Sequence, residues 1–235
     1  MFSEKMFKSW WWKFKRVLFV ALVRVSNRMF GLEASHRFPL IGWLNRLWII
    51  LTEFASPARR RQARFERENV DAPWFVPAAI SYIERELHPE FVGFEWGCGR
   101  STFWFARRVR HITSVEGRRV WFNEALRRVI NDDLTERVAL RLAEVSTEHD
   151  FSKAEIERYA GVIDEFADSS LDFIVVDGHF RDACISRVGK KLRAGGLLII
   201  DNSEVVSAEL LNLLKIGDFQ VWNNGIWETM VIRQA

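Results

Sequence analysis

A regular alternation of short apolar segments with amphipathic segments runs from Pro73 to the end of this chain, and it constrains the fold more than any other feature. The strand-like segments are residues 91–95, 111–116, 138–143, 171–177, 197–201, 219–222 and 229–232. The helix-like segments are residues 74–87, 102–109, 120–130, 181–192 and 203–214. Strands that alternate with helices pair in parallel and lie beneath those helices. The alternation therefore predicts an α/β domain built on a parallel sheet.

The first strand–helix junction carries a pattern typical of ligand binding. The predicted strand 91–95 ends in Glu95 and runs through Trp96 into Gly97-Cys98-Gly99. Glycines let a backbone approach a ligand closely, and the N–H groups of such a loop point toward it. Glu116 ends the next strand, at the position where an acidic side chain binds ribose hydroxyls in nucleotide-binding α/β domains. These strand ends together predict a site for a nucleoside-containing cofactor.

These residues resemble the class I S-adenosylmethionine-dependent methyltransferases over about residues 74–235. The segment FEWGCGRST looks like the family's E/D-x-G-x-G signature, and SVE looks like its ribose-binding strand end. A dinucleotide-binding domain would have a third glycine where this chain has Thr102, so the methyl donor is favoured over NAD. The resemblance implies a Rossmann-like sheet of parallel strands, with the last two strands forming a C-terminal antiparallel hairpin.

The resemblance also implies which residues hold S-adenosylmethionine. Carried over position by position, they are Glu95, Gly97, Cys98, Gly99 and Ser101 around the methionine end, Glu116 at the ribose and Glu144 near the adenine. Trp96 is expected to pack within the loop. A nucleophilic role for Cys98 is not favoured, because no base lies near it in the sequence.

A second group of polar residues follows the fourth and fifth predicted strands. Asp177 ends one strand, and Asp201 with Asn202 ends the next. These ends emerge at the same sheet edge as the glycine loop, and carboxylate and amide oxygens suit Mg²⁺ or a similar divalent cation. The segments LDFIVVDGH and GGLLIIDN are similar to the metal-dependent O-methyltransferases typified by catechol O-methyltransferase, whose metal ligands stand at these three positions. We expect the metal site; the alternative is that the aspartates only cap helices.

The expected chemistry is an in-line transfer of a methyl group from a sulfonium to a hydroxyl. A divalent cation at Asp177 would lower the pKa of that hydroxyl as a Lewis acid. The catechol-like enzymes use a lysine three residues after the first aspartate, and this chain has Phe180 there. His179 is therefore the expected catalytic base, with a polar role at the helix start as its alternative. Arg181 is expected to contact an anion or to lie on the surface.

The first 70 residues differ in composition from the rest. They hold 14 basic and 5 acidic side chains against 20 and 26 in residues 71–235, together with five of the eleven Trp and eight of the nineteen Phe. We therefore predict a basic, aromatic-rich helical arm at residues 1–70 and a methyltransferase domain at residues 71–235. Prolines at positions 57, 73 and 77 place the boundary near Asp71.

The arm itself is predicted to hold two amphipathic helices, within residues 11–25 and 41–54, where apolar residues recur at three- and four-residue steps. Trp and Phe beside Lys and Arg is the composition of a helix that lies in a membrane interface. The alternative is packing on the domain or on a second copy of the chain. Nucleic acid is the least favoured partner, because the aromatic residues lie in apolar stripes.

Other features bound the setting of the protein. No apolar run approaches the about 20 residues of a membrane span, and no signal peptide is expected. Two cysteines, Cys98 and Cys184, are too few for a disulfide framework or a Cys-based zinc site. We expect a cytoplasmic protein that contacts the membrane face peripherally or forms a homo-oligomer through its arm. The expected acceptor is a small-molecule, glycan or lipid-linked hydroxyl; a metal-independent methyltransferase and a non-catalytic binding module remain alternatives.

The connection between the third and fourth parallel strands, residues 145–170, is longer than usual. Ser152 and Glu155 have the spacing of a capping box, which predicts a helix that runs to Phe166. This segment either roofs the acceptor pocket or forms only a surface helix.

Overall fold

The structure is a computed structural model that describes residues 56–146, 151–207, 209–210 and 218–235. The chain divides into two compact units, Met1–Pro57 and Ala58–Ala235, and the second is described below. Both helices predicted in the arm lie outside the described residues, so their contacts with a membrane or a second copy stay predictions. Within the described ranges, no helix is long and apolar enough to cross a membrane.

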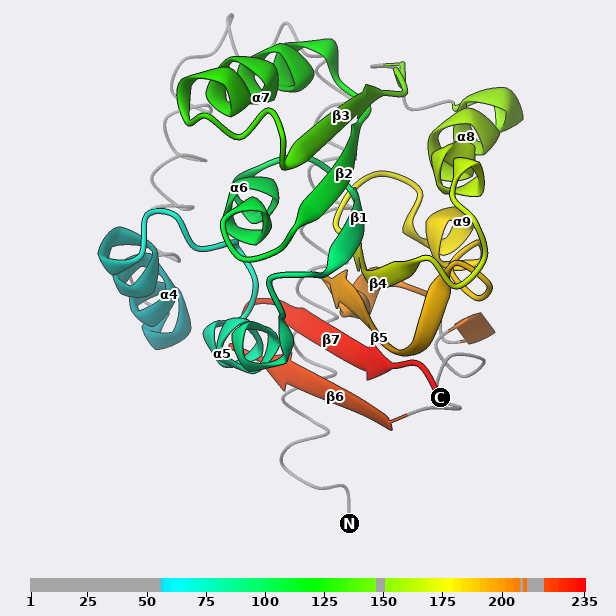
Figure 1. Cartoon of the computed structure of the whole chain (residues 1–235). Helices are drawn as coiled ribbons and strands as arrows, with labels where there is room; N and C mark the ends of the chain where they lie inside the picture. Colours follow the sequence, from blue (N-terminus) through cyan, green and yellow to red (C-terminus); the bar gives the residue numbers. More distant parts are fainter. Residues whose placement is uncertain (1–55, 147–150, 208, 211–217) are drawn as a thin grey trace, which may run out of the picture. The chain divides into compact units, whose positions relative to one another are not determined.

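A seven-stranded sheet with the order β3-β2-β1-β4-β5-β7-β6 organises the second unit (Figure 1). The strands are β1 Val92–Trp96, β2 His111–Glu116, β3 Val138–Leu142, β4 Leu171–Val176, β5 Leu192–Asp201, β6 Asp218–Asn223 and β7 Glu228–Arg233. Strands β1 to β5 pair in parallel, whereas β7 runs antiparallel to both β5 and β6. The predicted parallel sheet with a C-terminal antiparallel hairpin is confirmed.

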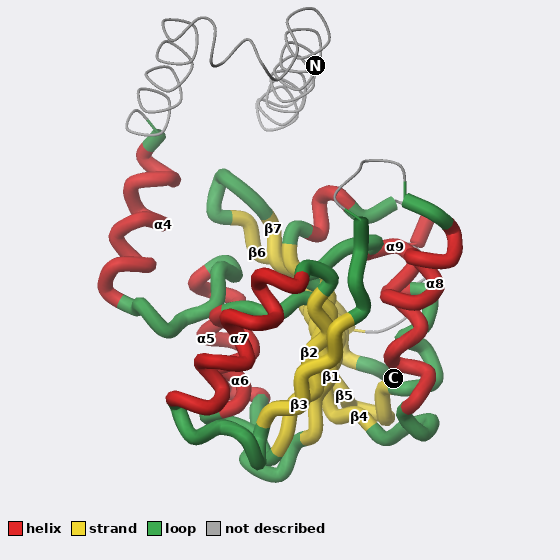
Figure 2. Tube along the Cα trace, turned by 90° about the horizontal axis from the view of Figure 1, so that it is seen from above, coloured by secondary structure: helices red, strands yellow, loops and turns green. Residues whose placement is uncertain are grey.

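Helices cover both faces of this sheet (Figure 2). They are α4 Pro57–Glu68, α5 Pro77–Glu86, α6 Arg100–Ala106, α7 Arg119–Asn131, α8 Lys153–Ala160 and α9 Arg181–Ile185, with 3₁₀ turns at Gly161–Glu165 and Ser203–Val205. Helices α5, α6 and α7 lie on one face, and α8 and α9 lie on the other. Every side chain of β4 is buried, as expected for a strand covered on both faces.

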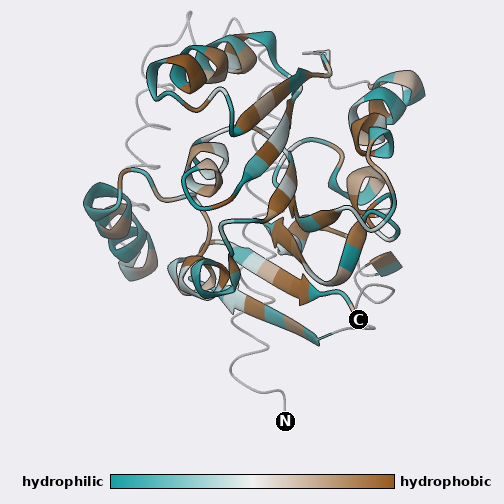
Figure 3. Cartoon of the chain, in the orientation of Figure 1, coloured by the Kyte–Doolittle hydropathy of each residue, from teal (hydrophilic) through white to brown (hydrophobic). Residues whose placement is uncertain are grey.

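The two faces bury separate hydrophobic clusters. Phe173 of β4 joins the cluster under α5 and α6, while its neighbour Ile174 joins the cluster under α8 and α9. Successive side chains of a strand point to opposite faces, so one strand supplies both clusters. Figure 3 shows the resulting contrast between the hydrophobic central strands and the mostly hydrophilic α4.

Helix α9 is shorter than the helix predicted for residues 181–192. It ends at Ile185, and β5 already begins at Leu192, with an irregular register between the pairs Leu171–Leu192 and Phe173–Leu197. The apolar side chains that gave the helical spacing are all buried in the second cluster; they are Cys184, Ile185, Val188 and Leu192. A short helix, a turn and the start of a strand bury the same residues that a longer helix would bury. The helix predicted from residue 203 begins as a 3₁₀ turn, and most of its remainder lies outside the described residues.

The capping box at Ser152 is confirmed. The backbone N–H of Glu155 donates to Ser152 Oγ (3.2 Å), and the backbone N–H of Ser152 donates to Glu155 Oε2 (2.9 Å). Helix α8 therefore begins at Lys153, ends at Ala160 and continues as a 3₁₀ turn as far as Glu165.

Helix α4 belongs to the same compact unit as the sheet. Its buried Gln62 accepts a hydrogen bond at Oε1 from Asn224 Nδ2 in the β6–β7 turn (3.0 Å). The compact unit therefore begins at Ala58, before the boundary predicted near Asp71.

Candidate functional site

The loops that follow β1 and β4 touch at the carboxyl edge of the sheet. Gly97 has a φ of +100°, and a Cβ added there would lie 2.9 Å from the backbone carbon and oxygen of Asp177. A Cβ on Gly178 would lie 2.8 Å from the backbone nitrogen of Gly97. Both positions therefore require glycine. Their contact brings the predicted donor loop directly beside Asp177.

Glu95 supports this loop from beneath. Its side chain is fully buried, and its carboxylate accepts hydrogen bonds from Ser101 Oγ, from Thr102 Oγ1 (2.5 Å) and from Ser114 Oγ (2.7 Å). Thr102 Oγ1 in turn accepts from the backbone N–H of Gly99 (3.1 Å). The hydroxyls thus tie the acidic strand end to the glycine loop. Glu95 and Ser101, both expected around the methionine end, hold the loop in shape by hydrogen bonds to each other.

Burial raises the pKa of Glu95 to about 7, although its three hydroxyl partners favour the ionised form. The folded chain thus binds this proton more tightly than the unfolded chain, where the pKa is near 4.5. The stabilising effect is complete below pH 4.5 and is lost as the pH rises through about 7.

We expect Glu95→Gln to remove this loss, which amounts to about 3 kcal/mol of unfolding free energy. Urea denaturation at a series of pH values measures it. The control is Glu90→Gln, at an exposed position, which should keep the wild-type pH profile. Identical profiles for Glu95→Gln and the wild type would contradict the assigned pKa.

Glu116 faces the same loop from the end of β2. Its Oε1 accepts from the backbone N–H of Arg118 (2.8 Å), and the backbone N–H groups of Gly117 and Cys98 also favour its ionised form and lower its pKa. Burial nevertheless raises the pKa of Glu116. The structure therefore brings Glu116, the residue predicted to bind the ribose, beside the predicted glycine loop.

Cys98 lies in the middle of this loop and is half-buried. Burial raises the pKa of its thiol to about 12, so the thiol stays protonated near neutral pH. A thiolate is the reactive form of cysteine. That Cys98 does not act as a nucleophile stays a prediction.

Glu144 belongs to the loop after β3, and His179 lies beside the loop after β2. The exposed carboxylate of Glu144 forms a bidentate pair with the guanidinium of Arg119 (2.9 and 2.7 Å). The His179 ring lies against Gly117, since a Cβ there would be 2.9 Å from Cδ2 of His179. Burial lowers the pKa of His179, and the charges of Arg118 and Arg181 lower it further. Neutral imidazole can accept a proton, but this ring lies beside the loop that follows Glu116.

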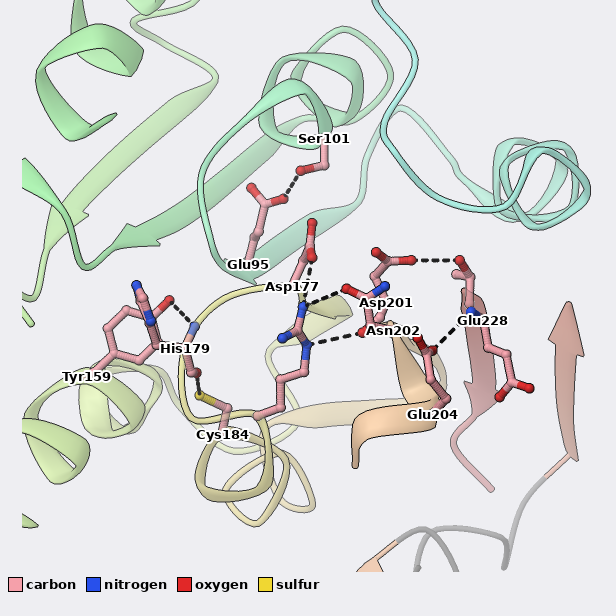
Figure 4. Close-up of polar contacts among 12 residues, drawn as sticks. Glu95, Ser101, Tyr159, Asp177, His179, Cys184, Asp201, Asn202, Glu204 and Glu228 are labelled. Atoms are coloured by element: carbon pink, nitrogen blue, oxygen red, sulfur yellow. Dashed lines mark hydrogen bonds and ion pairs between the residues drawn. The ribbon is translucent and has the colours of Figure 1, made fainter. Parts of the chain in front are cut away.

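Asp177, Asp201 and Asn202 do come together, as predicted, and Arg181 lies between them. Its Nη2 donates to Asp177 Oδ1 (3.2 Å) and to Asn202 Oδ1 (3.3 Å), and its Nε donates to the backbone oxygen of Asp201 (3.1 Å). Asp201 Oδ1 accepts from Thr229 Oγ1 (2.7 Å). Figure 4 shows Asp177 facing Asp201 and Asn202, with His179 and Tyr159 away from this group.

Burial raises the pKa of both aspartates at this edge. The negative charge of Asp177 raises the pKa of Asp201 further, and the charge of Arg181 opposes the rise at both. The two carboxylates therefore share one permanent cation, the guanidinium.

The arrangement does not fit the expected divalent cation. An ion between Asp177 and Asn202 would need the position that Nη2 of Arg181 occupies, and two cations in one place repel each other. Among the described residues, no group of three or more His, Cys, Asp or Glu side chains could hold a metal ion. The expectation of Mg²⁺ at Asp177, Asp201 and Asn202 is therefore corrected: the side chains of Asp177 and Asn202 bind Arg181, which also donates to the backbone oxygen of Asp201. The sequence signal was Arg181 itself, four residues after Asp177 and the first residue of α9.

Sequence reasoning also missed Arg100, which follows the glycine loop directly. Its guanidinium carbon lies 5.4 Å from the centre of the Trp74 ring. Its Nη1 is buried and has no hydrogen-bond partner in the described part of the chain. A buried guanidinium nitrogen without a partner marks a place where an anion would be favourable.

No protein-family model matches this sequence, and no curated protein matches it either. Solved structures do match the fold. A methyltransferase from Geobacter sulfurreducens superposes with a TM-score of 0.50 at 16% identity, over 81% of this chain and 96% of that one. A SAM-dependent O-methyltransferase from Thermotoga maritima gives a TM-score of 0.50 at 15% identity, over 72% of this chain and 70% of that one. The chain therefore has the fold of the S-adenosylmethionine-dependent methyltransferases.

Proposed function

We propose that this protein binds S-adenosylmethionine at the loop after β1 and transfers its methyl group to an acceptor oxygen. The observation that carries the proposal is the position of Glu116. Its carboxylate accepts from the backbone N–H of Arg118 after β2, and the backbone N–H of Cys98 in the glycine loop also lowers its pKa. An acidic group beside such a loop, at adjacent parallel strand ends, is suited to ribose hydroxyls.

The surrounding residues complete the proposed donor site. Arg100 has a buried Nη1 without a partner in the described structure, and the carboxylate of the donor's methionine would satisfy it. His179 and Gly117 lie against each other next to Glu116, on the side proposed for the adenosine. This placement supports His179 as a contact of the donor rather than as the base of the reaction.

The acceptor half of the site is proposed at the neighbouring strand ends. Gly97 and Asp177 are in contact, so the group formed by Asp177, Arg181 and Asn202 adjoins the donor loop. Such polar side chains orient an oxygen-bearing acceptor better than an apolar one. The Thermotoga maritima protein of the same fold is an O-methyltransferase, which supports an oxygen acceptor here.

Glu116→Gln should weaken the binding of S-adenosylmethionine by about ten- to a hundredfold, because the amide loses the charge that strengthens hydrogen bonds from ribose hydroxyls. Isothermal titration calorimetry with S-adenosylmethionine and S-adenosylhomocysteine measures the affinities. The matched control is Glu124→Gln on α7, whose side chain is exposed and pairs only with Arg127 within the described residues.

Equal affinities for Glu116→Gln and the wild type would contradict the proposed donor site. Turnover is measured separately as the formation of S-adenosylhomocysteine from labelled S-adenosylmethionine, with a small-molecule extract as the source of acceptors. Donor binding without any turnover would instead support a non-catalytic binding module.

A further inference from the structure

Arg181 is the permanently charged centre of the proposed acceptor site. It is the first residue of α9, and it reaches the ends of two parallel strands, β4 through Asp177 and β5 through Asp201 and Asn202. Nε and Nη2 make the three hydrogen bonds that Arg181 forms with described residues. The other terminal nitrogen, Nη1, has no partner in the described part of the chain.

The backbone holds the guanidinium in this position. Phe180, just before Arg181, has a φ of +52°, and Asn202 has a φ of +50°. These left-handed conformations turn the chain sharply after each strand, so that Arg181 and the Asn202 amide face each other. The side chain of Arg181 is 21% exposed, so part of it is reachable from solvent.

The charges at this edge are compatible with an anionic acceptor. Arg181 supplies one positive charge, part of which its ion pair with Asp177 offsets, and S-adenosylmethionine bound as proposed would add the positive sulfonium. A guanidinium stays protonated in proteins and presents N–H groups in a planar fork that matches carboxylate and other anionic oxygens. It withdraws electrons from a bound hydroxyl less than a divalent metal does, so it suits an oxygen that is already ionised.

We propose that Arg181 takes the place of a divalent metal and binds the methyl-accepting oxygen through Nη1, so that the acceptor is a carboxylate or an ionised acidic hydroxyl and the transfer needs no metal. This inference rests on the proposed function. The anionic oxygen forms a bond to the methyl carbon, the bond from that carbon to sulfur breaks, and sulfur keeps the electron pair. The products are a methyl ester or ether and neutral-sulfur S-adenosylhomocysteine. No proton is transferred, which agrees with Phe180 in the position of the lysine.

The first test is metal binding, which does not depend on turnover. Mn²⁺ is titrated near neutral pH into the wild-type chain, Arg181→Met and the double variant Arg181→Met/Asp177→Asn. Arg181→Met exposes the oxygens of Asp177 and Asn202 and should bind Mn²⁺ at least about tenfold more tightly than the wild type. The double variant should lose this gain. The control is Arg193→Met, which removes an arginine paired with Asp172 near the start of β4 and should gain no Mn²⁺ site.

Three results would overturn the inference. One is tight Mn²⁺ binding by the wild type that disappears in Asp177→Asn, because the strand ends would then be a metal site. Another is an Arg181→Met variant that has the melting temperature of the wild type but binds Mn²⁺ no more tightly. The third is an equal gain in Arg193→Met. If Arg181→Met does not fold, Arg181→Lys serves instead. Lysine keeps the positive charge but lacks the planar fork of N–H groups. Turnover should therefore fall at least about tenfold, while the affinity for S-adenosylmethionine stays unchanged.

The second test is turnover with labelled S-adenosylmethionine and a small-molecule extract. Chelation with EDTA should leave the rate unchanged. Label released as methanol by alkali identifies methyl esters and hence carboxylate acceptors, whereas stable label in ethers identifies acidic hydroxyls. Labelled N-methyl products, or a rate abolished by EDTA and restored by Mg²⁺, would overturn the inference. A chain that binds no S-adenosylmethionine by calorimetry would disprove the proposed function, and the Mn²⁺ titrations would still test the place of Arg181.

Discussion

Gly97→Ala should weaken the binding of S-adenosylmethionine by about a hundredfold and lower the free energy of unfolding by roughly 2–3 kcal/mol. Gly97 has a φ of +100°, which alanine adopts only with strain. Its new Cβ would also lie 2.9 Å from backbone atoms of Asp177, which cannot rotate away. The loops after β1 and β4 would have to separate, and this displaces the proposed donor site. Calorimetry measures the affinity, and urea denaturation measures the stability.

Gly99→Ala is the matched control for the stability change. Gly99 has an extended backbone with a φ of −175°, and a Cβ there meets no atom within 4 Å. Alanine at this position should therefore leave the free energy of unfolding within about 0.5 kcal/mol of the wild type. If Gly97→Ala and Gly99→Ala were equally stable, the close contact between the two loops would be refuted.

Trp96→Ala should lower the free energy of unfolding by about 3–5 kcal/mol, the usual cost of removing a large buried aromatic side chain. Trp96 is fully buried, and its ring meets the edge of Phe94 at a centroid distance of 4.7 Å. Its Nε1 donates to the backbone oxygen of Tyr159 in α8 (3.2 Å). The substitution would therefore leave a cavity between β1 and α8 and an unpaired carbonyl group.

Trp121→Ala controls for the loss of a tryptophan as such. Trp121 lies on α7 with 63% of its surface exposed, and its removal should change the free energy of unfolding by no more than about 0.5 kcal/mol. Urea denaturation followed by circular dichroism compares the two variants. Similar losses for both would show that Trp96 does not pack as described.

The strands were predictable because their burial is local in sequence. The segment 111–116 coincides with β2, and the ends of β1 and β4 differ from the prediction by a single residue. In β4, a continuous apolar run with a polar residue after it specifies a covered strand and the edge where it stops. Helix α9 was predicted too long because burial of Cys184, Ile185, Val188 and Leu192 is compatible with more than one backbone path.

Side-chain roles at the site were less predictable. The sequence places Glu95 at a strand end, which predicts contact with a ligand. In the structure its carboxylate instead accepts hydrogen bonds from the hydroxyls of Ser101, Thr102 and Ser114. Thr102 and Ser114 are far from one another in the sequence, and no sequence pattern marked them as hydrogen-bond partners of Glu95. Whether a carboxylate faces a ligand or the protein depends on which donors the folded chain brings beside it.

The sequence by itself determined the order of the strands along the chain, the edge at which Glu95, Glu116, Asp177 and Asp201 emerge, and the need for glycine beside Glu95. These follow from apolar periodicity and from the parallel pairing that the alternation requires. Only the tertiary structure decided what lies between Asp177 and Asn202. Arg181 reaches them because α9 starts at this edge and because residues 180 and 202 turn the chain sharply. The side-chain oxygens of Asp177 and Asn202 can bind a metal ion or a guanidinium, and the choice depends on the direction of one long side chain, which sequence spacing does not specify.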